Sequence, residues 1–236
     1  MPGNSATLEI CVETASGLAT CIAAGADRVE LCAALDLGGL TPSAGLMDRA
    51  AGRPIPCHAM IRPRPGDFSY DAAEIAIMAR DIARVKETGL SGVVLGATAG
   101  GRLDTDALVR LLDAAKGLER TLHRAIDTLQ DPLAGVDDAI ALGFDRILTS
   151  GGSPSLADGA AMVLEMHRRA EGRIVIAAGG GLTETIAKDL RTAGLRAFHA
   201  SCKARPDPQP DPFKFGTSRI VEPDPARIVS LLAALK

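Results

Sequence analysis

The sequence predicts a single (β/α)8 barrel over residues 1–236. Three observations support this fold class. Strand-like and helix-like segments alternate eight times, a glycine motif recurs four times at helix ends, and the first loop carries no nucleotide-binding fingerprint. Eight alternations of strand and helix in about 230 residues are what a closed α/β barrel needs.

The first two predicted strands share one short phrase, Leu8-Glu9-Ile10-Cys11 and Val29-Glu30-Leu31-Cys32. Apolar and polar residues alternate in both copies, which is typical of β-strands. An alanine-rich helix is expected between them over residues 15–24, and Gly25 follows it. Two strands joined by one helix should lie side by side and parallel. The carboxylates and thiols of both copies are therefore expected on one wall of the barrel.

The recurring glycine motif marks the places where a helix ends and a buried strand begins. Its pattern is small-Gly-x-x-x-apolar, and its glycines are Gly25, Gly89, Gly143 and Gly194. Glycine readily adopts the left-handed conformation that ends a helix. The four strands that follow these glycines alternate with four other strand-like segments, residues 8–12, 56–61, 120–126 and 173–178. Together they make eight strands.

The remaining segments follow the pattern of helices. They are residues 15–24, 43–51, 71–88, 104–116, 132–142, 156–170, 183–193 and 224–235. A doubly wound open sheet is the structural alternative, but its first loop should be a glycine-rich phosphate site, and here that loop is Glu13-Thr14-Ala15. Residues 203–225 contain six prolines. We expect an ordered loop or arm before the last helix there, or a segment that covers a neighbouring subunit.

Composition excludes several classes of protein. The chain is 47% hydrophobic with a net charge of −3, and no apolar run approaches the length of a membrane span. We therefore expect a soluble protein without a membrane span or a basic patch for nucleic acid. The N-terminus lacks the features of a signal peptide, and five cysteines do not form a dense disulfide framework. A cytoplasmic location with reduced thiols is the prediction, and no organic cofactor is implied.

Polar residues that point inward at the carboxyl ends of the strands are the candidates for a site, because barrel enzymes build their sites there. The candidate catalytic residues are Glu9, Glu30, Arg62, His123, Arg124, Asp127 and His199. Unpaired, such charges are costly to bury, so they must neutralise one another, meet water or hold a ligand. Clustered buried charge more often marks a function than a structural polar core.

Two of these residues allow alternative interpretations. His123 is either a general acid or base whose pKa is tuned by Glu9 or Asp127, or a core histidine bonded to Glu30. Arg62 either clamps a carboxylate or phosphate, or balances the charge of Glu30.

The glycine run after the seventh strand is a candidate anion site. The backbone amides of Gly179, Gly180 and Gly181, with Ser201 after the eighth strand, could bind a phosphate at the start of a helix. The alternative is that these glycines only permit a tight turn. Arg124 lies on the same end of the barrel, or points outward between helices.

Cys11 and Cys32 are the candidate metal ligands. They are expected at equivalent positions on neighbouring strands, whose backbones lie about 4.8 Å apart. Two thiolates at that spacing can hold one soft ion such as Cu(I). The alternative is that both cysteines are buried as small hydrophobic residues.

The chain resembles the CutC copper homeostasis protein family over residues 8–201. The resemblance lies in nine phrases: Leu8-Glu9-Ile10-Cys11-Val12, Gly25-Ala26-Asp27-Arg28-Val29-Glu30-Leu31-Cys32, Gly38-Gly39-Leu40-Thr41-Pro42-Ser43, Met60-Ile61-Arg62-Pro63-Arg64, Gly66-Asp67-Phe68, His123-Arg124-Ala125-Ile126-Asp127, Leu148-Thr149-Ser150-Gly151, Gly179-Gly180-Gly181 and Phe198-His199-Ala200-Ser201.

The resemblance implies a (β/α)8 barrel, a cytoplasmic location, and self-association as a homodimer or larger homo-oligomer. It also implies a part in copper handling, with Cys11 and Cys32 at the positions of the family's strand-one and strand-two cysteines. The other motif residues are more typical of an enzyme site than of a copper carrier. We therefore keep two functions open: a protein that binds Cu(I) through barrel-end cysteines, and a barrel enzyme that acts on a small anionic or phosphorylated molecule.

Overall fold

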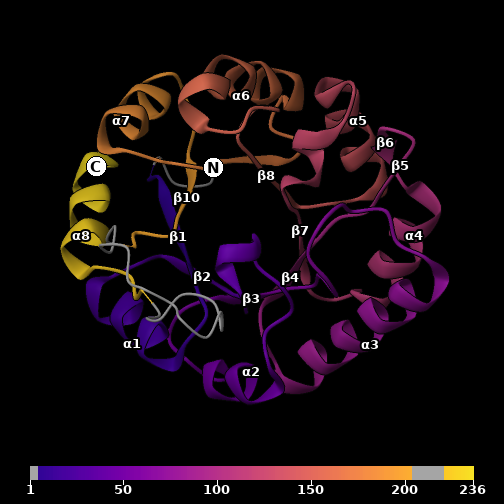
Figure 1. Ribbon diagram of the computed structural model, residues 1–236. Coiled ribbons are helices and arrows are strands. Elements are labelled where there is room, and N and C mark those ends of the chain that lie inside the picture. The colour runs from indigo at the N-terminus through magenta and orange to yellow at the C-terminus, as the bar shows by residue number, and fades with distance from the viewer. Residues whose placement is uncertain (1–4, 204–220) are drawn as a thin grey trace, which may run out of the picture.

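The computed structural model describes residues 5–203 and 221–236. Figure 1 shows a closed barrel of parallel strands inside a ring of helices, in the order β1-β10-β9-β8-β7-β4-β3-β2. The barrel strands are β1 (Thr7–Val12), β2 (Arg28–Leu31), β3 (Cys57–Met60), β4 (Gly92–Leu95), β7 (Glu119–Leu122), β8 (Arg146–Thr149), β9 (Val175–Ala178) and β10 (Ala197–Ala200). A small hairpin, β5 (Thr98–Ala99) with β6 (Arg102–Leu103), follows β4. The predicted (β/α)8 barrel is confirmed.

The helices lie where the sequence predicts them, within two residues at each end. They are α1 (Ala15–Ala24), α2 (Ala44–Ala50), α3 (Ala72–Thr88), α4 (Thr105–Ala114), α5 (Pro132–Leu142), α6 (Leu156–Ala170), α7 (Glu184–Thr192) and α8 (Pro225–Ala234). Each begins after a Ser, Thr or Asp whose side chain accepts a hydrogen bond from a backbone N–H of the first turn. These local caps explain why the boundaries can be predicted.

The predicted left-handed glycines end their helices. Gly25, Gly89 and Gly143 are the caps of α1, α3 and α5, with φ angles of 82°, 74° and 83°. Gly194 differs slightly, because Ala193 caps α7 and Gly194 follows it with φ 109°. In each case the turn leads at once into the next barrel strand.

One predicted strand is too long. The segment 120–126 was expected to be extended throughout, but β7 ends at Leu122 and a short 3-10 helix, η2 (Arg124–Thr128), follows. The cause is the side chain of His123, whose Nδ1 accepts a hydrogen bond from the Ala125 N–H and so caps η2. The local bond turns the chain and leaves His123 at the mouth of the barrel.

Apolar side chains fill the space between strands and helices, while polar side chains occupy the inside of the barrel. Leu8, Ile10 and Val12 of β1 belong to the main apolar core, as the alternation predicts. On the inner face, Glu9 is paired in register with Arg28 of β2 and with His199 of β10. The fold therefore concentrates charge on the barrel axis.

The predicted proline-rich arm, residues 203–225, is described only at its two ends. Residues 204–220 lie outside the described residues. Lys203 forms a bridge with Pro223, and α8 then begins at Pro225. Within the two described ranges, no helix is both long and apolar enough to cross a membrane.

Candidate functional site

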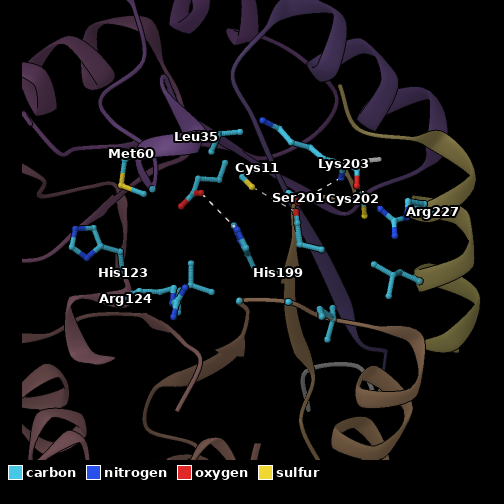
Figure 2. A pocket seen from close by; sticks show the side chains of 18 of the residues that line it. Cys11, Leu35, Met60, His123, Arg124, His199, Ser201, Cys202, Lys203 and Arg227 are labelled. Atoms are coloured by element: carbon cyan, nitrogen blue, oxygen red, sulfur yellow. Dashed lines mark hydrogen bonds and ion pairs between the residues drawn. The ribbon is translucent and has the colours of Figure 1, made fainter. Parts of the chain in front are cut away.

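A cavity of about 350 Å³ opens at the carboxyl ends of the barrel strands. In Figure 2, His199 lies between Arg124 on one side and Arg227 on the other. Predicted site residues that line the cavity are Cys11, Glu30, Arg62, His123, Arg124, Gly180, Gly181, His199 and Ser201. The other four, Glu9, Cys32, Asp127 and Gly179, are not among its lining residues. The structure thus gathers most of the predicted set around one space.

A thiol, a carboxylate and an imidazole meet at the inner end of the cavity. Ligand atoms of Cys11, Glu30 and His199 all lie within 4.8 Å of one another, and all three residues are buried. Cys11 is paired in register with Glu30, and His199 reaches them from β10 on the other side of β1. Glu30 Oε1 has no hydrogen-bond partner among the described residues. Three potential metal ligands are therefore close enough to share one ion.

His199 is held between two carboxylates. Its Nδ1 lies 2.8 Å from Glu9 Oε1, and its Nε2 lies 3.8 Å from Glu30 Oε2. Burial disfavours the imidazolium, but interactions with Cys11 and Glu30 and the hydrogen bond to Glu9 outweigh burial, so the pKa of His199 is raised well above 6.5. Hydrogen bonding to His199 and the nearby arginines lower the pKa of Glu9 despite its burial. Glu9 is thus an ionised carboxylate that orients His199.

The two cysteines are not at equivalent positions. The register pairs Cys11 with Glu30, so Cys32 lies two residues beyond the position opposite Cys11, just after the end of β2, and the expectation of equivalent positions for the two thiols is wrong. Cys32 is fully buried, in one apolar cluster with Cys11, Met60 and Val94. Its Sγ–H donates to Glu30 Oε2 at 3.4 Å. Burial and the charge of Glu30 raise the pKa of Cys32 well above 9.0, so the uncomplexed side chain is a thiol.

Two buried arginines inside the barrel were not predicted as site residues. Arg28 donates to the carboxylates of Glu9 and Glu119. Its NH2 also donates to Thr121 Oγ1 at 3.1 Å and lies 3.0 Å from His58 Nδ1. Arg146 is buried nearby and helps to lower the pKa of Glu9. The signal was available in the sequence, because Arg28 and Glu30 alternate with apolar residues and so share one face of β2.

His58 belongs to this structural network. It is fully buried beside Arg28, and burial followed by the charge of Arg28 lowers its pKa to about 4. His58 is therefore a neutral histidine at neutral pH.

His123 does not contact Glu30, so the interpretation of a core histidine bonded to that carboxylate is wrong. Its Nδ1 accepts from the Ala125 N–H at 3.1 Å, and its ring lies 4.7 Å from the Phe68 ring, between centroids. Burial and the charge of Arg62 lower its pKa to about 3. Because Nδ1 is an acceptor, the proton of the neutral ring is on Nε2.

Arg62 does not balance the charge of Glu30 either. Its NH1 donates to the carbonyls of Leu37 at 2.9 Å and Gly39 at 3.1 Å, and its NH2 donates to the Gly66 carbonyl at 2.7 Å. The guanidinium carbon lies 5.0 Å from the centre of the Phe68 ring. Backbone carbonyls and an aromatic face therefore hold Arg62 in place.

Arg124 lines the cavity and does not point outward between helices. Its Nε donates to Asp127 at 2.8 Å, and its NH2 donates to Ser150 Oγ at 2.6 Å. Asp127 also accepts from the backbone N–H groups of Ser150 and Gly152, so it ties the loop after β8 to Arg124. Asp127 is a positioning residue that does not reach the cavity.

The glycine run forms a turn that Arg124 packs against. Gly180 and Gly181 have φ angles of 97° and 98°, which side chains rarely adopt. A Cβ on Gly180 would lie 3.3 Å from Arg124 NH1. Thr183 then caps α7. The turn therefore brings backbone amides, a guanidinium and a helix N-terminus to one side of the cavity.

The opposite side of the cavity carries two further cations. Lys203 Nζ lies 2.7 Å from Glu13 Oε1, and Arg227 donates to the Lys203 carbonyl. Both side chains line the cavity beside Ser201. The mouth of the cavity thus carries cationic side chains on two sides, while the thiol of Cys11 and the carboxylate of Glu30 lie at its inner end.

Comparisons with known proteins agree with the fold. The model of the CutC family matches residues 6–204. A family protein CutC of Caulobacter vibrioides is 46% identical over 227 residues, which cover 95% of this chain and 92% of the relative. A family protein CutC of Sinorhizobium medicae is 47% identical over 201 residues, 84% of this chain and 82% of the relative.

Solved structures give the same result. A CutC crystal structure from Streptococcus agalactiae matches with a TM-score of 0.79 and 33% identity, and the match covers 83% of this chain and 98% of that one. The matched family region includes every strand of the barrel and every predicted site residue. This chain belongs to the CutC family.

Proposed function

We propose that this protein takes part in copper homeostasis by binding Cu(I) at the cluster of Cys11, Glu30 and His199. The meeting of these three ligands at the inner end of the cavity is the observation that carries the proposal. The relative from Streptococcus agalactiae is described as a candidate copper homeostasis protein. Membership of the CutC family makes the same role the first hypothesis for this chain.

The chemistry of the donors fits a soft ion. Thiolates and thioethers favour Cu(I), and imidazole is a common copper ligand. Cys11 supplies a sulfur at the cavity wall, and Cys32 is a second sulfur in the same apolar cluster. Glu30 Oε1, buried without a partner, supplies negative charge that would offset the charge of a cation. The site that we propose therefore extends the predicted cysteine pair by a histidine and a carboxylate.

The surroundings of His199 support a ligand role. Because Nδ1 is bonded to Glu9, the nitrogen left for a metal is Nε2, on the side of Glu30. A carboxylate behind a metal-binding histidine fixes its orientation and raises its basicity. The ligands must lose their protons to bind a metal, and the raised pKa of His199 means that this proton is held firmly. Copper affinity is therefore expected to increase with pH.

Location and assembly are part of this proposal. All five cysteines are free and buried, which is compatible with a reducing compartment, and we propose that the protein works in the cytoplasm. Self-association as a homodimer or larger assembly stays a prediction that follows from the family resemblance.

An anaerobic titration with Cu(I) against a competing chelator tests the copper site. Loss of a group that only hydrogen-bonds to a metal ligand costs about 10–100-fold in metal affinity. Loss of a ligand itself should cost more, so we expect Cys11→Ser to weaken Cu(I) binding by about a hundredfold or more. Cys32→Ser is expected to weaken it by about tenfold if the second sulfur contributes.

Cys57→Ser is the matched control, because Cys57 is also a buried thiol of a barrel strand but does not line the cavity. Its Cu(I) affinity should equal that of the wild type. If Cys11→Ser bound Cu(I) with the affinity of the wild type, the proposed site would be wrong, however many copper ions the protein binds in total.

The size and charge of the cavity favour a second candidate function. A volume of about 350 Å³ lies within the range of small-molecule sites and exceeds what a single ion occupies. We propose, as this second candidate, that the cavity binds a small anionic or phosphorylated molecule for an enzymatic reaction. Arg124, the turn at Gly179–Gly181 and Ser201 would bind its anionic group. The polar groups at the inner end would then face its reactive part.

Calorimetric titration with glycerol 3-phosphate tests the anion site. The wild-type protein should bind it, and Arg124→Gln should weaken binding by about tenfold, because a charge-assisted bond is lost. Arg110→Gln is the control, since Arg110 is exposed on α4 and away from the cavity. Equal binding by the wild type and Arg124→Gln would contradict this assignment.

A further inference from the structure

One wall of the cavity consists of Arg62, Phe68 and His123, and no described protein group uses its capacity to bind an anion. All three residues line the cavity. The Phe68 ring contacts both of the others, with its centre 4.7 Å from the centre of the His123 ring and 5.0 Å from the guanidinium carbon of Arg62. Neither Arg62 nor His123 belongs to the proposed copper cluster.

His123 presents a hydrogen-bond donor without an acceptor. The Ala125 N–H occupies Nδ1, which places the ring proton on Nε2. His123 is 3% exposed, and its Nε2 has no partner among the described residues. Buried N–H groups are nearly always hydrogen-bonded in folded proteins, so this donor calls for a specific acceptor.

Arg62 presents a buried positive charge without a counter-charge. The residue is 5% exposed. Its neighbours are three backbone carbonyls and the hydroxyl of Tyr70, none of which carries a negative charge at neutral pH. In the ranges 5–203 and 221–236, no carboxylate forms an ion pair with it. A buried guanidinium is expected to be compensated by an anion.

Among the described residues, two carboxylates line the cavity, Glu184 and Glu30. Glu184 Oε1 accepts from Ser230 Oγ at 2.9 Å, and the contacts of Glu30 also lie away from this wall. Glu30 Oε2 accepts from Cys32 and faces His199. No described carboxylate therefore supplies the anion that this wall lacks, which points to a ligand. The pair offers few donors beside a flat aromatic ring, which suits a planar carboxylate better than a tetrahedral phosphate, whose oxygens need more donors.

We propose that Arg62 and His123 bind the carboxylate of a small molecule whose second anionic group lies at Arg124 and the Gly180–Gly181 turn. The ligand class is a phosphorylated carboxylic acid. This inference rests on the second candidate function and adds to it the identity of the group at the other end of the ligand. It is independent of whether the thiol cluster binds copper.

Two commercially available probes differ in the group that matters. 3-Phosphoglycerate carries a carboxylate where glycerol 3-phosphate carries a hydroxymethyl group, and both have the same phosphate ester. By calorimetry, the wild-type protein should bind 3-phosphoglycerate about tenfold more tightly than glycerol 3-phosphate, because a charge-assisted pair of bonds is added.

Variants of His123 test whether the difference in affinity between the two probes arises at the wall of Arg62, Phe68 and His123. In His123→Phe, which keeps an aromatic ring against Phe68, the preference for 3-phosphoglycerate should fall to about twofold, with unchanged affinity for glycerol 3-phosphate. His123→Asn gives a second test, because asparagine can still cap η2 if the phenylalanine variant does not fold. His167→Phe is the control on α6 and should retain the full preference. Arg124→Gln should weaken the binding of both probes together.

The possible results distinguish failure of the carboxylate site from failure of the anion site at Arg124. If the wild-type protein binds both probes equally, or if the preference survives in both His123 variants, the carboxylate site is wrong and the anion site at Arg124 stands. If the wild-type protein binds neither probe, both assignments are overturned. A preference that is lost in the His123 variants and kept in His167→Phe supports the carboxylate site.

Discussion

Replacing Glu9 by alanine is expected to lower the free energy of unfolding by about 3–5 kcal/mol, because it leaves buried positive charges without their partner. Glu9 is 1% exposed and contacts both Arg28 and His199. Removing it leaves Arg28 with the partly exposed Glu119, and His199 with Glu30 at 3.8 Å, as the remaining carboxylate partners. Urea unfolding at pH 7, followed by circular dichroism, measures the effect.

Glu165→Ala is the control for this change. Glu165 forms an ion pair with Arg168 on the exposed face of α6, and such surface pairs contribute about 0–1 kcal/mol. A cost for Glu9→Ala no larger than that of the control would show that the interior charges do not depend on Glu9.

The stabilisation by Glu9 should also depend on pH. Its pKa is lowered in the folded protein from an ordinary value of 4.5. A group whose pKa is lower in the folded state stabilises the fold fully above its unfolded pKa. The contribution is therefore complete at pH 7 and is lost as the pH falls below 4.5. The difference in unfolding free energy between the wild type and Glu9→Ala should narrow over the same range.

Replacing Gly159 by alanine is expected to cost about 3 kcal/mol or more, because the added methyl group collides with backbone. A Cβ at Gly159 would lie 1.8 Å from the Ser150 carbonyl oxygen and 3.1 Å from Gly151 Cα. The loop after β8 cannot move away from α6 without breaking hydrogen bonds, since the N–H and the hydroxyl of Ser150 both donate to Asp127. Because Ser150 also holds Arg124, the variant should weaken anion binding as well as stability.

Gly45→Ala is the matched control for this glycine. Gly45 also lies inside a helix, α2, and a Cβ there would meet nothing within 4 Å. Alanine favours a helix over glycine by about 1 kcal/mol, so the control should be stabilised slightly. If Gly159→Ala unfolded at the same denaturant concentration as the wild type, the close approach of α6 to the loop after β8 would be wrong.

The features that could be predicted from sequence are those governed by local chemistry. The bounds of α1, α5 and α6 agree with the prediction to the residue, because each helix shows apolar periodicity and follows a capping side chain, and a glycine ends α1 and α5. The end of β7 was missed, since the side chain of His123, and not the strand pattern, turns the chain there. The hydrogen bond from the Ala125 N–H to His123 Nδ1 ends the strand, although residues 120–126 have the pattern of an extended segment.

Most of the candidate site residues lie around one cavity, but their pairings could not be predicted from the sequence. The stagger between neighbouring barrel strands depends on closure of the whole barrel, so the offset between Cys11 and Cys32 could not be read from either copy of the repeated phrase. The partners of Arg62 are backbone carbonyls of loops, which leave no pattern in the sequence. Alternation places Arg28 on the same face of β2 as Glu30, but charge at the start of a strand usually meets solvent, so the burial of Arg28 and Arg146 could not be predicted.

X-ray absorption at the copper edge, on protein loaded anaerobically with one equivalent of Cu(I), tests the proposed copper site most directly. We predict a spectrum with sulfur and nitrogen or oxygen neighbours in the wild type, and reduced sulfur scattering in Cys11→Ser but not in Cys57→Ser. A wild-type spectrum without sulfur, or one that Cys11→Ser leaves unchanged, would contradict binding at the cluster of Cys11, Glu30 and His199.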